Sequence, residues 1–199
     1  MPANRPLILA SASPYRQALL QRLGLPFLVV AAEIDETPRP GELPAQTAVR
    51  LAEAKARAVA PQYPLALLIG CDQIADCHGM AVGKPRDRAD ALEQLRTMQG
   101  RTVTFHTAVA LLNAQTGTCR TALVDVTSTF RHLDDATLRA YLDREQPFDC
   151  AGSVKAEGLG IALFTRLASD DPTALIGLPL IRLTDLLEAE GVRPLAVVV

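Results

Sequence analysis

Asp72 is the residue whose type and position best suit it to chemistry. It follows an unbroken run of aliphatic residues, Leu65–Ile69, with only Gly70 and Cys71 between them. A short apolar run beside turn-type residues predicts a strand buried on both faces. Ligands of open α/β sheets bind at the carboxyl ends of such strands, where a carboxylate can hold a metal ion or accept a proton. The alternative is that Asp72 only opens a turn.

A second carboxylate and several cations suggest that the ligand carries phosphate. They are Glu33, Arg16, Lys55, Lys84 and Lys155. Carboxylates with dispersed Lys and Arg fit a metal-assisted attack on a phosphate ester, in which the cations neutralise the phosphates and carboxylate oxygens hold Mg²⁺ or Mn²⁺. These residues indicate a phosphate-handling α/β enzyme. For Glu33 a solvated loop is the alternative, and for Lys155 a local ion pair with Glu157.

Ser11–Arg16 predicts an anion site at the start of a helix. Leu7–Ala10 predicts a short buried strand, Ser13 is a suitable N-cap, and Pro14 suits the first helical position. Backbone N–H groups at such a helix start point toward an anion. Arg16 opposes the helix dipole, which makes sense if a phosphate lies between them. A capped helix with a solvated Arg16 is the alternative.

Lys55 lies on the apolar face of a predicted helix over residues 45–60. The other members of that stripe are Ala48, Leu51, Ala52, Ala56 and Val59. An unpaired buried ammonium is costly. Lys55 therefore either has a partner or extends to the edge of the sheet.

The remaining patterns predict further strands and helices in one domain or two small lobes. Gly79 marks a hairpin turn that returns the chain to Lys84, near Asp72. Lys155 and Glu157 would share one face of a strand. Further strands are expected at 27–32, with a long hairpin at 102–112 and 118–130, and helices at 87–98, after Asp134 and after Pro179. The tail, 195–199, is either a frayed end or an edge strand.

Composition excludes several classes of protein. The 199 residues are 49% apolar, enough for a sizeable core, and a formal net charge of -2 does not favour a general binder of polyanions. We expect no membrane span, and Leu7–Ala10 is too short for a signal-peptide core. The four Cys and three His lack zinc-site spacing, so we expect inert thiols in a reducing cytoplasm.

Seven segments, in order over nearly the whole chain, resemble motifs of the Maf-like nucleotide pyrophosphatases. They are residues 11–16, 33–37, 51–55, 70–73, 83–85, 151–158 and 171–179. The resemblance is closest to the YceF subfamily, which hydrolyses 7-methyl-GTP to its monophosphate and pyrophosphate. It implies a single α/β domain over residues 1–199, with an elongated mixed β-sheet flanked by helices and a central cleft between two lobes.

The resemblance also implies roles for individual residues. Asp72 would be the proton acceptor that activates water, and Glu33 and Asp72 would be ligands of Mg²⁺ or Mn²⁺. The phosphates would be held by Ser11, Ser13, Arg16, Lys55, Lys84 and Lys155. Substrate specificity would depend on Tyr15, Gln73 and Glu157. The family's habit further implies a homodimer, and we expect neither a nucleic acid polymer nor a membrane as partner.

The chemistry of Tyr15 and Glu157 suits a methylated purine. Methylation at N7 leaves positive charge on the base, which can stack on Tyr15 by cation–π attraction. An ionised Glu157 accepts hydrogen bonds from the N–H donors of guanine. Two alternatives remain open: a pyrophosphatase for UTP, dTTP or other modified nucleotides, and a nucleotide-binding regulator of cell division without catalysis.

Overall fold

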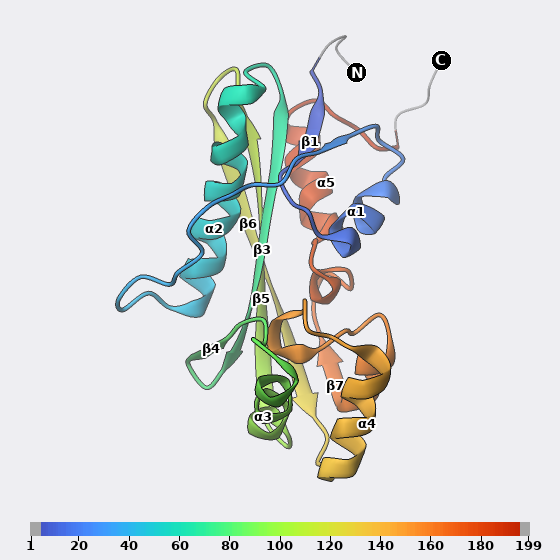
Figure 1. Cartoon of the computed structure of the whole chain (residues 1–199). Helices are drawn as coiled ribbons and strands as arrows, with labels where there is room; N and C mark the ends of the chain where they lie inside the picture. The colour runs from blue at the N-terminus through green and yellow to red at the C-terminus, as the bar shows by residue number, and fades with distance from the viewer. Residues whose placement is uncertain (1–4, 196–199) are drawn as a thin grey trace.

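The computed structural model describes residues 5–195, in which a mixed seven-stranded sheet spans the length of the molecule (Figure 1). The strand order is β2-β1-β3-β5-β6-β7, and β4 pairs with β3 outside this path. The strands are β1 Leu7–Leu9, β2 Leu28–Val29, β3 Leu67–Cys77, β4 Met80–Val82, β5 Thr102–Asn113, β6 Cys119–Phe130 and β7 Phe164–Ala168. Of the tail at 195–199, for which a frayed end or an edge strand was predicted, residues 196–199 lie outside the described part.

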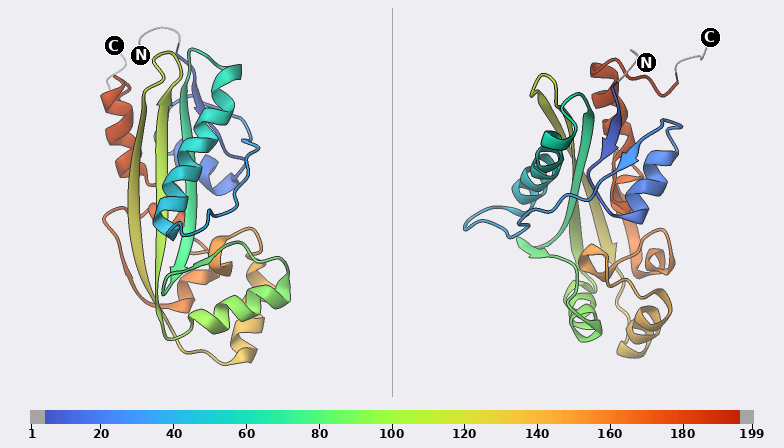
Figure 2. Two further views of the ribbon diagram at one scale, coloured as in Figure 1. Left: turned by 90° about the vertical axis from the view of Figure 1, so that its left-hand side faces the viewer. Right: turned by 45° about the horizontal axis from the view of Figure 1, so that its top comes forward.

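Helices cover both faces of the sheet. They are α1 Pro14–Gln21, α2 Pro44–Val59, α3 Arg88–Met98, α4 Asp135–Glu145 and α5 Leu180–Ala189. Helix α2 packs along one face, and α1 and α5 pack on the opposite face (Figures 1 and 2). The predicted apolar stripe of α2 is confirmed, and Lys55 is buried within it. The second strand is shorter than the predicted 27–32, because only Leu28–Val29 pair with β1.

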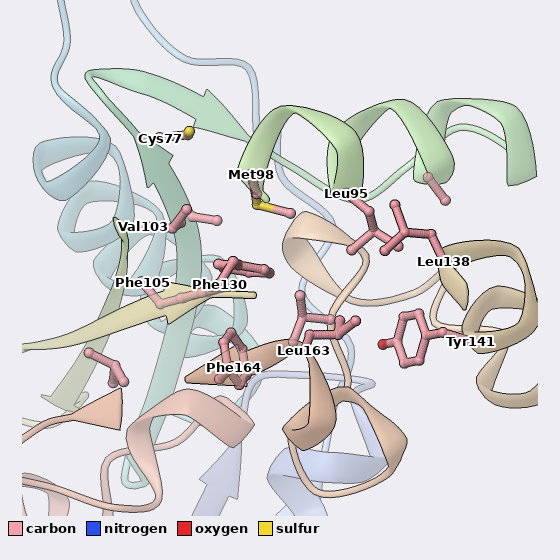
Figure 3. Packing of buried hydrophobic residues seen from close by; sticks show 14 of the residues in the cluster. Cys77, Leu95, Met98, Val103, Phe105, Phe130, Leu138, Tyr141, Leu163 and Phe164 are labelled. Atoms are coloured by element: carbon pink, nitrogen blue, oxygen red, sulfur yellow. The ribbon is translucent and has the colours of Figure 1, made fainter. Parts of the chain in front are cut away.

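Separate hydrophobic clusters at the two ends of the sheet form the two lobes. In one lobe, α1 and α5 pack Leu19, Leu183 and Leu187 against β1 and β3. In the other, α3 and α4 enclose the cluster of Figure 3, where the rings of Phe130 and Phe164 meet edge to face with centroids 4.8 Å apart. Strands β3 and β5 extend through both lobes (Figure 1). The predicted elongated α/β architecture is confirmed.

One edge of β3 is only partly paired. Strand β1 runs parallel to Leu67–Ile69, and β4 runs antiparallel to Ala75–Cys77. Strand β5 occupies the opposite edge of β3 from Leu67 to Asp76. In the described part of the chain, residues 70–74 therefore have no strand partner on the β1 side. This interruption leaves room for a ligand between the lobes.

Asp72 lies in the middle of β3, which corrects the prediction that the strand ends beside it. Within the apolar run, Leu67–Ile69 form the part of the strand that helices bury from both faces, whereas Leu65 is exposed. Pairing with β5 and β4 extends β3 to Cys77. Strand β1 stops pairing with β3 at Ile69. Asp72 thus lies just beyond the carboxyl end of β1, where a ligand site was expected.

We expect Gly70→Ala to destabilise the fold strongly. A Cβ at Gly70 would lie 1.9 Å from the carbonyl oxygen of Ala52 and 2.9 Å from the backbone nitrogen of Ala56. Both atoms belong to the main chain of α2, so relief requires moving the helix, at a cost of about 3 kcal/mol. Urea unfolding would measure this, with Gly83→Ala as control because its Cβ would meet no atom within 4 Å. Equal midpoints for the two variants would contradict the prediction.

Candidate active site

A cavity of about 630 Å³ opens at the interrupted edge of β3. Its walls come from the loops after β1 and β2, the connection after β4, and residues near 149–157 and 175–177. Leu67 and Ile69 direct their backbone hydrogen bonds toward β1. By the two-residue period of a strand, the backbone N–H and C=O of Gln73 point to the same side. The cavity therefore has a main-chain donor and acceptor beside its side chains.

Most of the sequence-predicted site residues converge on this cavity. Those that line it are Ser11, Ser13, Tyr15, Arg16, Lys55, Asp72, Gln73, Lys84 and Glu157. Glu33 and Lys155 are not among the lining residues. The fold thus gathers polar groups from separate segments of the chain at one opening between the lobes.

The start of α1 forms a polar corner of the cavity. The Ser13 side chain accepts a hydrogen bond from the backbone N–H of Arg16 at 3.4 Å, which confirms Ser13 as the N-cap. The Arg16 guanidinium donates from Nε to the carbonyl of Gly177 at 3.0 Å and from Nη1 to Ser11 Oγ at 3.4 Å. These contacts hold Arg16 against the cavity wall, so the alternative of a solvated Arg16 does not apply. Gly177 was not found from the sequence.

Lys55 links two carboxylates at the floor of the cavity. Its Nζ lies 2.6 Å from Oδ1 of Asp72 and 2.7 Å from Oε1 of Glu36. Lys55 and Asp72 are 7% and 6% exposed, whereas Glu36 is exposed. Of the two interpretations of Lys55, the partnered one is confirmed. The partners satisfy a charge that would otherwise be costly to bury.

The two carboxylates that share Lys55 differ in their readiness to take a proton. Burial raises the pKa of Asp72 above its ordinary value, and the charges of Lys55 and Arg16 only partly oppose this. Burial also acts to raise the pKa of Glu36, but the hydrogen bond and charge of Lys55, together with Lys84 and Arg16, lower it overall. Pairs of titratable groups with opposite shifts are typical of acid–base sites. Asp72 is the better proton acceptor of the two.

Glu33 lies outside the cavity, which corrects its predicted place beside Asp72. Its side chain is exposed, and Glu36, three residues later, occupies the position next to Lys55. The acidic stretch Glu33–Glu36 did predict a carboxylate here. It could not predict which one, because the connection between β2 and α2 is irregular and has no periodicity to fix the direction of each side chain.

Lys84 and Gln73 complete the middle of the cavity. Lys84 is exposed on the connection after β4, and the carbonyl of the preceding Gly83 accepts a hydrogen bond from Gly152 N–H at 3.0 Å. The Gln73 amide Nε2 lies 2.9 Å from Thr107 Oγ1 and 3.0 Å from each of the carbonyl oxygens of Ala174 and Leu175. The NH₂ group of Gln73 is therefore engaged by protein acceptors.

Tyr15 and Glu157 line the cavity near Asp149. Burial raises the pKa of Glu157 above its ordinary value. The Tyr15 hydroxyl donates to Oδ1 of Asp149 at 3.4 Å, and Asp149 also lines the cavity. Asp149 was not among the site residues predicted from the sequence.

Lys155 does not reach the cavity, which corrects its predicted role in holding phosphate. Its Nζ pairs with Oε1 of Glu145 at 3.0 Å and lies 5.6 Å from the centroid of the Tyr15 ring. The alternative, an ion pair with Glu157, is also wrong. Residues 155–160 form turns closed by hydrogen bonds to the Lys155 carbonyl, so Lys155 and Glu157 do not share the face of a strand.

The carboxylates of Asp72 and Glu36 fit a divalent cation that also binds oxygens of the substrate. Asp72 and Glu36 converge on one position, where they hold the ammonium of Lys55. Among residues 5–195, no group of three or more His, Cys, Asp or Glu side chains is arranged to hold a metal. Mg²⁺ is commonly bound by one or two carboxylates plus phosphate oxygens and water, so two carboxylates are sufficient for it.

Comparison with known proteins gives a consistent result. The family model described as "Maf-like protein" matches residues 6–190. The 7-methyl-GTP pyrophosphatase of Ralstonia nicotianae is 58% identical over 182 residues, which cover 92% of this chain and 94% of the relative. The protein of the same name from Polaromonas sp. is 54% identical over 191 residues, covering 96% of this chain and 87% of the relative. Within residues 5–195, no helix has the length and apolarity needed to cross a membrane.

Proposed function

The chain belongs to the family of Maf-like proteins, and we propose that it is a nucleotide pyrophosphatase that hydrolyses 7-methyl-GTP to 7-methyl-GMP and pyrophosphate. The relatives that carry the name 7-methyl-GTP pyrophosphatase support the reaction and the substrate. The observation that carries the proposal is the buried Asp72 with a raised pKa, beside cations in one cavity. Such a group can activate water next to a bound phosphate.

The cationic end of the cavity would hold the triphosphate. Arg16, fixed by Gly177 and Ser11, presents a planar guanidinium suited to phosphate oxygens. The backbone N–H groups at the start of α1 add the favourable end of a helix dipole. Lys84 contributes an exposed ammonium from the connection after β4. Together these groups would orient the α-phosphorus toward Asp72.

Asp72 would act as the general base. Its carboxylate takes a proton from water as the water oxygen forms a bond to the α-phosphorus. The bond between that phosphorus and the bridging oxygen of the β-phosphate breaks, and pyrophosphate leaves with the bonding electrons. Lys55 holds Asp72 in place at 2.6 Å, and its charge also favours the growing negative charge on the phosphoryl oxygens. The raised pKa of Asp72 improves its ability to accept a proton.

We propose Mg²⁺ or Mn²⁺ as the divalent cation of this reaction. Asp72 and Glu36 would hold it together with oxygens of the substrate. When bound, it supplies Lewis-acid neutralisation of the phosphate charge. Glu36 suits the role of a permanent ligand because its lowered pKa keeps it ionised.

A panel of nucleoside triphosphates would test the function. Pyrophosphate release from 7-methyl-GTP, GTP, UTP and dTTP should be measured with Mg²⁺, with Mn²⁺ and with EDTA. We expect the highest kcat/KM for 7-methyl-GTP and loss of turnover in EDTA. A preference for UTP or dTTP would reassign the substrate, and binding without turnover would favour the regulatory alternative.

We expect Tyr15→Arg combined with Glu157→Gln to shift preference away from 7-methyl-GTP. Arg at position 15 would repel a positively charged base instead of stacking on it, and Gln at position 157 would remove the negative charge that favours it. The ratio of kcat/KM for 7-methyl-GTP over UTP should fall by about 10²-fold, since the two contacts would each contribute on the order of 1–2 kcal/mol. Steady-state kinetics on both substrates would measure the ratio, and an unchanged ratio would reject the specificity assignment.

Three broader proposals accompany this function. We propose that the chain works as a single domain, since residues between Ala10 and Gly177 line one cavity. We propose a cytoplasmic homodimer, and a sedimentation mass of one chain at micromolar concentration would refute the dimer. We also propose that a free nucleotide, rather than a nucleic acid polymer, is the partner, which the formal net charge of -2 supports.

A further inference from the structure

Asp149 is a cavity residue with no part in the phosphate chemistry above. It lies in the turn between α4 and the 3₁₀ turn Ala151–Ser153, at the same end of the cavity as Tyr15 and Glu157. Its Oδ1 accepts the Tyr15 hydroxyl hydrogen bond at 3.4 Å and the Cys150 thiol at 3.5 Å. Asp149 is exposed and lines the cavity.

The Tyr15 hydroxyl stays protonated and available as a donor to Asp149. Burial raises the pKa of Tyr15 first, and the neighbouring Cys150 and Asp149 raise it further. A phenol that donates a hydrogen bond to a carboxylate gains electron density in its ring. The attraction of an aromatic ring for a cation depends on the electron density of its face. Asp149 therefore strengthens the ring of Tyr15 as a partner for a cation.

Lys155 lies beside the ring of Tyr15 but does not compete with the ligand for it. Its ammonium lies 5.6 Å from the ring centroid and is paired with Glu145 at 3.0 Å. Tyr15 lines the cavity, whereas Lys155 is not among the lining residues. The Glu145 carboxylate balances the Lys155 charge. A second cation can thus approach Tyr15 from the cavity.

The charged residues that line the cavity form two groups. Arg16, Lys55 and Lys84 act on Glu36 beside Asp72, whereas Asp149 acts on Tyr15 and Glu157. A ligand that fits this division is negatively charged at its phosphates and positively charged at its base. A neutral base gains less from Asp149 and Glu157 than a positively charged one.

We propose that Asp149 is a positioning residue for base specificity, which acts through Tyr15 to favour a positively charged purine such as N7-methylated guanine over its neutral counterpart. The inference rests on the proposed function, because it concerns the base end of the same site. It differs from that function in assigning the charge discrimination to a residue outside the predicted specificity set.

Asp149→Asn tests the proposal, because it removes the charge while keeping an oxygen that can accept from Tyr15. The measurement is the ratio of kcat/KM for 7-methyl-GTP over GTP. We expect this ratio to fall about fivefold, the range of a partly exposed cation–π contact. The loss should lie in KM for 7-methyl-GTP, with kcat and the GTP parameters little changed. Asp149→Glu should restore part of the ratio.

Two further variants distinguish a positioning role of Asp149 from the general effect of losing a carboxylate. Asp143→Asn also removes one carboxylate near the C-terminal part of α4, but Asp143 pairs with Arg88 outside the cavity, so the ratio should stay at the wild-type value. Tyr15→Phe removes the hydrogen bond and keeps the ring. Combined with Asp149→Asn, it should give a smaller loss than the product of the two single losses.

The outcomes distinguish this inference from the proposed function. If the wild-type protein shows no preference for 7-methyl-GTP over GTP, the proposed function fails and the inference fails with it. If the preference exists and Asp149→Asn retains it, only the inference is overturned. Equal losses on both substrates, or independent losses in the double variant, would likewise exclude action of Asp149 through Tyr15.

Discussion

Asp72→Asn is expected to lower kcat for pyrophosphate release by about 10²–10⁴-fold, the usual contribution of a positioned base. Asn has nearly the same shape and can still accept the hydrogen bond from Lys55 through its amide oxygen. It cannot accept a proton from water at any working pH. Nucleotide binding, measured by calorimetry in the presence of Mg²⁺, should remain detectable because Arg16 and Lys84 are unchanged.

Asp76→Asn provides the matched control for this variant. Asp76 lies on the same strand, faces His106 and does not line the cavity. It should retain wild-type turnover. In the wild-type enzyme, kcat/KM should fall as the pH drops toward the pKa of Asp72, which lies above the ordinary 3.8 because of burial. Substantial turnover by Asp72→Asn would show that another group is the base.

Lys55→Met should cost both activity and stability. Met keeps most of the apolar stem but leaves Asp72 buried without the cation that lies 2.6 Å from it. Breaking a buried ion pair from one side costs about 3–5 kcal/mol, and loss of a phosphate-facing charge should lower kcat/KM by about 10²-fold. Urea unfolding and steady-state kinetics would measure the two effects.

The stability loss of Lys55→Met should depend on pH with a defined sign. Burial already raises the pKa of Asp72, and removing Lys55 removes the largest influence that lowers it. The folded variant then binds a proton more tightly than the unfolded chain, so the loss is full above the folded pKa of Asp72 and shrinks as the pH falls toward 3.8. Unfolding at pH 8 and pH 5 would compare the two regimes.

Lys84→Met is the control for charge alone. Lys84 is an exposed cation of the same cavity, so its replacement should weaken phosphate binding without the loss of stability. A deficit of Lys55→Met that is the same at pH 8 and pH 5 would contradict the assignment of the loss to an unpaired Asp72.

Local sequence patterns predicted which helices and strands form better than they predicted where each of them ends. The stripe of α2, the caps Ser13 and Asp134 and the hairpin of β5 and β6 follow from periodicity and capping chemistry, and the structure confirms them. The true end of β3 did not follow, because its extension to Cys77 depends on pairing with β5 and β4. Such pairing joins residues far apart in the chain.

The site was predictable where a regular element directs the side chain. Lys55 and Asp72 lie on a helix and a strand whose periods fix their direction, and the structure brings them together. Glu36, Asp149 and Lys155 lie in irregular segments, where only tertiary packing decides which way each side chain turns and which partner it meets. The missed residues are therefore those on loops.

The interrupted edge of β3 separates residues that the reaction requires from residues that can change with the substrate. The reacting carboxylate belongs to a strand that pairs with β5 from Leu67 to Asp76, whereas Asp149 and Glu157 come from connecting segments and Tyr15 from the start of α1. Substitutions in those segments can retarget such an enzyme to another nucleobase during evolution without disturbing the scaffold that breaks the phosphoanhydride. Enzymes of this fold can therefore differ in the nucleotides they accept while they keep the same reaction.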